Sequence, residues 1–146
     1  MTSFQTIVIA VDFSEHARKA LDMGADLAKQ FGSKVHLVHA FELPMPVLTP
    51  YEVALPDNFM GDARKAGRRE LDALERVLVD AGLEVTSHLR DGPPDMAIDE
   101  VAKEVSADLI VIGTRGNTGL KHIVLGSVAE RTVRFAHCPV LTVGHE

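Results

Sequence analysis

Apolar residues gather in five short segments separated by polar or glycine-containing stretches. Residues 7–11 and 109–112 are continuous apolar runs rich in β-branched side chains, which is typical of buried parallel strands. Residues 84–90 alternate polar and apolar side chains, which favours a less buried edge strand. Together with the apolar segments at residues 35–40 and 140–143, the pattern predicts five strands.

Helical spacing of apolar residues fills the intervals between these strands. Ser14 is a candidate N-cap for a first helix, and Gly32 is a stop signal at its end. A second helix is predicted over residues 66–81, a third opens at the proline pair 93–94, and a short fourth covers residues 127–135. Strands that alternate with helices predict an α/β protein: a single-domain, Rossmann-like, open parallel five-stranded sheet with helices on both faces.

The composition is that of an ordinary globular protein and predicts one domain over residues 1–146. With 46% apolar and 25% charged residues, the chain is neither disordered nor fibrous. A net charge of -6 argues against a nucleic-acid partner, because phosphate backbones are held by basic surfaces. The apolar runs are far shorter than the ~20 residues of a membrane span. A single cysteine and an opening unlike a signal peptide lead us to expect a cytoplasmic protein.

A proline-rich connection follows the second predicted strand. It runs over residues 41–57 and contains four prolines, so regular structure throughout is not expected. It leaves the carboxyl end of a strand, where it could cover a ligand. A variable surface excursion is an equally good interpretation.

The stretch from Gly113 to Ser127 has the composition of an anion-binding loop. It follows an apolar strand and leads into a helix, so its backbone is expected at the carboxyl edge of the sheet. Gly113, Gly116 and Gly126 allow backbone N–H groups to approach a phosphate closely, and the helix start adds its positive dipole end. Arg115 contributes a cation to the same loop. These features predict binding of ATP with Mg²⁺ or Mn²⁺, although no lysine separates Gly126 from Ser127 as in a P-loop.

Three separated segments resemble the universal stress protein family. The glycines fit its pattern of glycine, two residues, glycine, nine residues, and then glycine followed by serine or threonine. Residues 7–17 look like the family's first strand and loop, and residues 126–133 and 138–143 look like its ending. The resemblance covers nearly the whole chain. It implies the nucleotide-binding branch of the family and a strand order of 3-2-1-4-5.

The resemblance also implies which residues meet an adenine nucleotide. Asp12 and the backbone near Val11 and Ala40 are assigned to the adenosine end. The ribose and phosphates are assigned to a second set: Gly113, Arg115, Gly116, Gly126, Ser127 and Val128. For Asp12 a simple helix-capping role remains open.

The remaining reactive side chains show weaker patterns. Cys138 precedes a proline at the last predicted strand and is interpreted as a small buried residue, not a reactive thiol. His36 and His39 are three apart on a strand, so their side chains point to opposite faces and cannot share a metal. No ligand spacing is found either for the other histidines considered: His16, His88, His137 and His145.

We therefore expect a nucleotide-responsive binding protein that acts on an unknown protein partner. The predicted site positions phosphates but contains no evident general base, so any ATP hydrolysis should be slow. One alternative is an ATPase or adenylyl-transfer enzyme that uses Asp12, Arg115 and Ser127, and another is a stress protein that binds no nucleotide. A third is a receiver that accepts a phosphoryl group on Asp12, although the sequence lacks the acidic cluster that receivers need. A homodimer through the edge strand at residues 140–143 is also expected.

Overall fold

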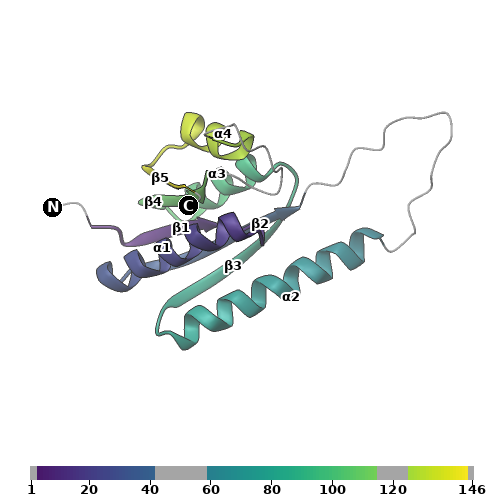
Figure 1. Cartoon of the computed structure of the whole chain (residues 1–146), viewed down its shortest axis with the longest axis horizontal. Coiled ribbons are helices and arrows are strands. Elements are labelled where there is room, and N and C mark those ends of the chain that lie inside the picture. Colours follow the sequence, from purple (N-terminus) through teal and green to yellow (C-terminus); the bar gives the residue numbers. More distant parts are fainter. Residues whose placement is uncertain (1–2, 42–58, 115–124, 145–146) are drawn as a thin grey trace.

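The computed structural model describes residues 3–41, 59–114 and 125–144. Strands and helices alternate along the chain in this part (Figure 1). In chain order the elements are β1 Thr6–Ala10, α1 Glu15–Phe31, β2 Lys34–Phe41, α2 Phe59–Asp80, β3 Glu84–Asp91, α3 Pro94–Glu104, β4 Leu109–Gly113, α4 Ser127–Phe135 and β5 Val140–Val143.

The strands form one parallel sheet in the order β3-β2-β1-β4-β5, which confirms the predicted fold class and strand order. β1 lies at the centre because its residues are the most completely buried, with Ile7, Val8 and Ile9 at 0% exposure. β3 at one edge is only partly buried, as its alternating pattern predicted.

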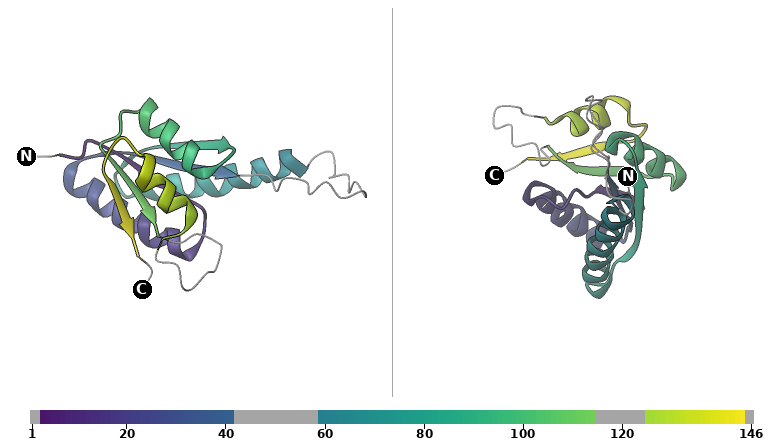
Figure 2. Two further views of the ribbon diagram at one scale, coloured as in Figure 1. Left: turned by 90° about the horizontal axis from the view of Figure 1, so that it is seen from above. Right: turned by 90° about the vertical axis from the view of Figure 1, so that its right-hand side faces the viewer.

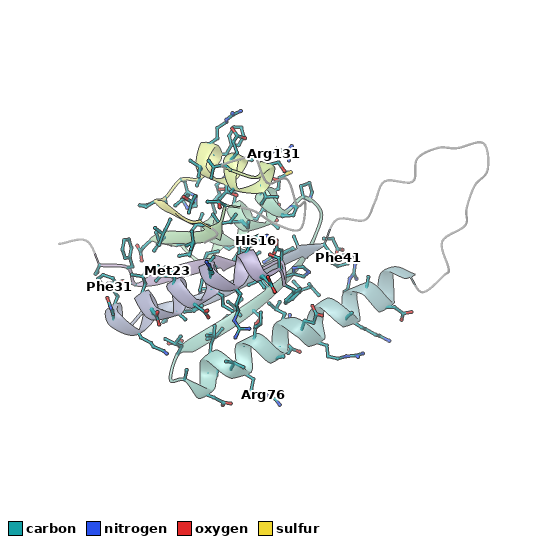
Figure 3. The ribbon with its side chains drawn as sticks, in the orientation of Figure 1. His16, Met23, Phe31, Phe41, Arg76 and Arg131 are labelled. Carbon is teal, nitrogen blue, oxygen red and sulfur yellow. The ribbon has the colours of Figure 1, made fainter. Side chains whose placement is uncertain are left out.

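Helices cover the two faces of the sheet in pairs (Figure 2). Leu21 from α1 and Leu71 from α2 belong to one buried cluster, and Ile98 from α3 and Ala129 from α4 belong to the other. Each helix presents its apolar stripe to the sheet and its charged side chains to solvent. On α2, for example, Leu71 is buried while Arg76 is exposed and points away from the sheet (Figure 3).

Both predicted signals of α1 are used. The Ser14 hydroxyl accepts a hydrogen bond from the Ala17 N–H at 3.1 Å, and Gly32 ends the helix with φ +67°, a conformation that favours glycine.

The predicted start of α2 at residue 66 is wrong, because the helix begins at Phe59. Residues 61–66 are mostly exposed and charged or small, so the apolar spacing that reveals the helix becomes clear only near Leu71. The proline-rich connection before α2 lies largely outside the described residues, and its role stays a prediction. Among the helices in the described ranges, none is long and apolar enough to cross a membrane.

Two helical glycines differ sharply in the space around them and give the first testable prediction. A methyl group at Gly24 would lie 2.5 Å from Cδ1 of the fully buried Ile9, whereas one at Gly67 would lie 3.5 Å from His39 and Leu89. We expect Gly67→Ala to raise the free energy of unfolding by about 0.5–1 kcal/mol, because alanine is the better helix former.

Gly24→Ala should lower that free energy by about 1 kcal/mol, because overpacking outweighs the same helix gain. Urea unfolding of both variants beside the wild type measures the effects. Equal shifts in one direction would contradict the close packing of α1 on β1.

Candidate functional site

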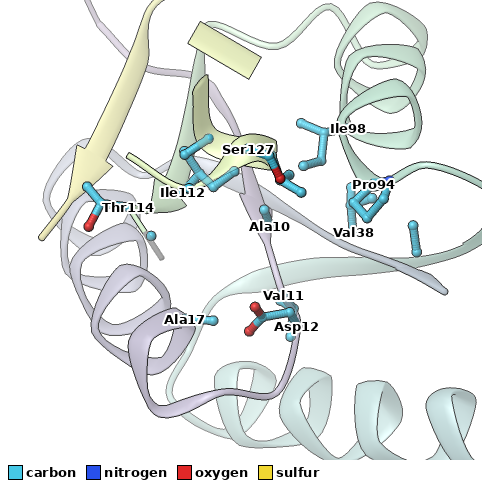
Figure 4. A pocket seen from close by; sticks show the side chains of 15 residues that line it. Ala10, Val11, Asp12, Ala17, Val38, Pro94, Ile98, Ile112, Thr114 and Ser127 are labelled. Atoms are coloured by element: carbon cyan, nitrogen blue, oxygen red, sulfur yellow. The ribbon is translucent and has the colours of Figure 1, made fainter. Parts of the chain in front are cut away.

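A cavity of about 210 Å³ opens at the carboxyl ends of the central strands (Figure 4). Its lining comes from the carboxyl ends of β1, β2 and β4, from the turn after β1, and from the N-terminal parts of α1, α3 and α4. Between β1 and β4 the chain changes direction across the sheet, because β2 and β3 extend to one side and β5 to the other. Ligands of open α/β sheets bind at this kind of switch point.

The described members of the predicted site all line this cavity. They are Val11, Asp12, Ala40, Gly113, Gly126, Ser127 and Val128. The other two predicted residues, Arg115 and Gly116, lie outside the described residues. Residues from three separate regions of the sequence therefore meet in one cavity, and their contact with a nucleotide stays a prediction.

The turn after β1 is held by its own side chains. Asp12 Oδ1 accepts hydrogen bonds from the Ser14 N–H at 2.9 Å and from the Ser14 hydroxyl at 2.5 Å. Ser14 is the N-cap of α1, so Asp12 orients the capping residue and is not itself the cap. Phe13 between them has φ +62°, a conformation uncommon for a bulky side chain. The turn is thus fixed before any ligand arrives.

His39 supports the same turn from the neighbouring strand β2, on the face of the sheet that α1 and α2 cover. Its Nδ1 lies 2.8 Å from the Val11 carbonyl oxygen, and its ring lies 4.5 Å from the ring of Phe13. A carbonyl oxygen can only accept, so Nδ1 must carry the hydrogen. This bond also explains why β1 ends at Ala10, one residue before its predicted end. A role for His39 in the site was not predicted, although its place near the carboxyl end of a strand was a usable signal.

The opposite wall of the cavity is built where β4 meets α4. The Thr114 carbonyl accepts a hydrogen bond from the Gly126 N–H at 2.6 Å, and the Thr114 N–H donates to Val143 at 3.0 Å. The first N–H groups of a helix have no partners within it, and Gly126 provides no side chain that could cap them. The start of α4 therefore offers donors and a positive dipole end to the cavity.

Charge is sparse on the described lining. Asp12 is the one ionisable side chain among the lining residues of the described ranges. Within these ranges no three His, Cys, Asp or Glu side chains gather into a metal-binding group. Ser127 supplies a hydroxyl oxygen, which suits a divalent cation carried by phosphate groups. Cys138 lies outside this cavity and is only partly buried, not buried as predicted. Burial and nearby carboxylates raise the pKa of its thiol, which agrees with its interpretation as unreactive.

Comparisons with known proteins place this geometry in a family. The model of the universal stress protein family matches residues 3–144. Universal stress protein MJ0531 of Methanocaldococcus jannaschii is 34% identical over 140 residues, which cover 96% of this chain and 82% of that protein.

Two solved structures share the fold over nearly their whole length. The hypothetical protein MJ0577 superimposes with a TM-score of 0.86 at 25% identity, and the superposition covers 99% of each chain. A universal stress protein from Archaeoglobus fulgidus, solved in complex with dAMP, gives 0.65 at 28% identity and covers 97% of this chain and 98% of that one. The chain belongs to the universal stress protein family.

Proposed function

We propose that the protein binds ATP in the cavity between β1, β4 and α4, and that occupancy regulates its interaction with a protein partner. The observation that carries this proposal is that a single cavity is lined by Asp12 in the turn after β1, by Gly113 at the end of β4 and by the start of α4. The carboxylate of Asp12 can accept hydrogen bonds from the adenosine half of a nucleotide, and the start of α4 can donate hydrogen bonds to its phosphates.

The two walls divide the nucleotide between them. Asp12 and Ser127 enter the cavity from different sides (Figure 4). A carboxylate repels phosphates but accepts hydrogen bonds from ribose hydroxyls or the adenine amino group, so the adenosine end belongs at Asp12. The apolar residues Val11, Val38 and Ala40 suit a base there. The phosphates then extend toward the glycines and the α4 start, with Arg115 and Gly116 assigned to them from sequence.

The relative from Archaeoglobus fulgidus supports an adenine nucleotide, since that protein was solved with dAMP. A Mg²⁺ or Mn²⁺ ion would accompany the triphosphate and take most of its ligands from phosphate oxygens and water, with Ser127 as the protein's oxygen donor. The ion would neutralise part of the phosphate charge, because the described lining residues include no cationic side chain.

Binding rather than turnover is the proposed activity. An ATPase or transferase would need a group that activates water or an acceptor, and Asp12 already accepts two hydrogen bonds from Ser14 on the same oxygen. Phosphate release over many turnovers at saturating ATP would favour the enzymatic alternative. Release of less than one equivalent would favour a regulator.

Substitution of Gly126 tests the nucleotide site. Its backbone has φ -66° and ψ 165°, which other residues adopt readily, so Gly126→Val should fold. The added side chain would occupy the space where backbone N–H groups approach phosphate. We expect calorimetry with Mg-ATP to show binding weakened at least about tenfold.

Gly61→Val is the matched control, because a side chain there meets open space on α2, and it should bind like the wild type. If the wild type gives neither heat nor a thermal shift with millimolar Mg-ATP, the chain belongs with family members that bind no nucleotide.

We also propose a homodimer through β5. This strand lies at the sheet edge and is only partly buried. The carbonyls of Pro139 and Val143 accept hydrogen bonds from β4, so alternation along the strand turns the N–H groups of Val140 and Thr142 outward. Two copies related by a twofold axis would pair these groups in antiparallel fashion.

Thr142→Pro should convert the dimer to a monomer, because it removes one outward donor at a position where edge strands tolerate proline. Thr142→Ala keeps the donor and should stay dimeric. Light scattering at micromolar concentration measures the mass of both. A monomeric wild type, or a folded Thr142→Pro variant that remains dimeric, would refute the interface.

A further inference from the structure

Two histidine side chains meet on the sheet away from the nucleotide cavity. Nδ1 of His36 in β2 lies 2.9 Å from Nε2 of His88 in β3, and the ring planes are inclined by 34°. β2 and β3 run parallel with Val38 opposite His88, so the two rings approach diagonally across neighbouring strands. Neither residue lines the nucleotide cavity.

The pair is half-buried, and ion pairs flank it on the same face. Lys34 and Glu84 lie 4.0 Å apart beside His36, and Arg90 contacts Glu104 of α3 at 2.7 Å beside His88. Both neighbouring carboxylates are therefore engaged with cations. The ring nitrogens of His36 and His88 are therefore the atoms at this position that can bind a metal ion.

The surroundings keep both rings neutral at pH 7, which is the form that binds metals. Burial lowers the pKa of His36, and Lys34 adds to this effect while Glu84 opposes it. Burial also lowers the pKa of His88, assisted by His36, Arg90 and Arg68 and opposed by Glu104.

The distance between the nitrogens matches two adjacent ligands of one metal ion. With metal–nitrogen bonds of about 2.0–2.1 Å, two imidazoles at a right angle have nitrogens about 2.9 Å apart, and tetrahedral ligands have them about 3.3 Å apart. Square-planar or tetragonal coordination is typical of Cu²⁺ and Ni²⁺. The observed 2.9 Å reaches either arrangement with a small movement of the rings, and nitrogen sites bind Cu²⁺ more tightly than Ni²⁺ or Zn²⁺.

Binding requires a tautomer shift and a small rotation of the two rings, so that both lone pairs point at the ion. In the neutral pair one ring donates its hydrogen to the other. When both facing nitrogens use their lone pairs on a metal, the donor ring carries its hydrogen on its other nitrogen instead. No net proton is released from the neutral pair.

We propose that His36 and His88 form a two-imidazole site for a divalent transition-metal ion, preferably Cu²⁺, with water in the remaining positions. The ion would link β2 to the edge strand β3. This site is independent of the nucleotide site.

The test is a titration of the full chain, freed of metal and without nucleotide, with Cu²⁺ alone and then with Ni²⁺ and Zn²⁺. Calorimetry and visible absorbance should report one equivalent of Cu²⁺ bound more tightly than the other two ions. His36→Gln and His88→Gln should each weaken that binding at least about tenfold. His137→Gln, which removes a partly exposed histidine beside Asp99, should leave it unchanged.

Thr86→His gives an independent test by gain of affinity. Thr86 is exposed on β3 opposite His36 and two residues before His88, so a third imidazole there would join the pair. Affinity for Cu²⁺ should rise at least about tenfold, because the ion gains a third imidazole ligand. No binding by the wild type would overturn the site. So would undiminished binding by the folded His36→Gln and His88→Gln variants, or no gain in Thr86→His.

Discussion

The parallel pairing of β1 with both β2 and β4 determines where the cavity forms. Ile7, Val8 and Ile9 of β1 are fully buried, and both edges of the strand pair within the chain. Its neighbours lead away in opposite directions across the sheet. The turn after β1 and the segment after β4 must then meet at one edge, and the cavity forms between them.

Rigid contacts hold the two sides of this cavity in place. On one side, hydrogen bonds fix the turn after β1. Within the turn and the start of α1 they link Asp12, Ser14 and Ala17, and from β2 the His39 ring donates to the Val11 carbonyl. On the other, Thr114 ties β4 to both β5 and the residue before α4. A ligand would therefore meet preformed walls, which lowers the ordering cost of binding. The proposed division into an adenosine end and a phosphate end follows from the carboxylate on one wall and the helix start on the other.

Most of the fold could be predicted because it depends on local patterns. The apolar runs of β1 and β4, the Ser14 cap and the Gly32 stop each carry their own signal. Gly113, Gly126 and Ser127 of the glycine pattern line the cavity, and their ligand is a proposal. The start of α2 was missed because its first turns face solvent and bury little.

Contacts that depend on strand register could not be predicted from the sequence. His36 and His39 do lie on opposite faces, as their spacing indicated, with His39 against Phe13 and His36 against His88. What the spacing could not show is that His88, far along the chain, would lie beside His36. That contact requires the pairing of β2 with β3 to be known residue by residue.

NMR can test directly whether the nucleotide binds in the cavity between β1, β4 and α4. Backbone amide resonances of the isotope-labelled chain would be recorded before and after addition of Mg-ATP. We predict that the resonances of Val11, Ala40, Gly113 and Gly126 shift, while those of Ser33 and Leu83, at the opposite ends of the strands, do not. Shifts confined to α2 and β3, or no shifts at all at saturating nucleotide, would contradict it.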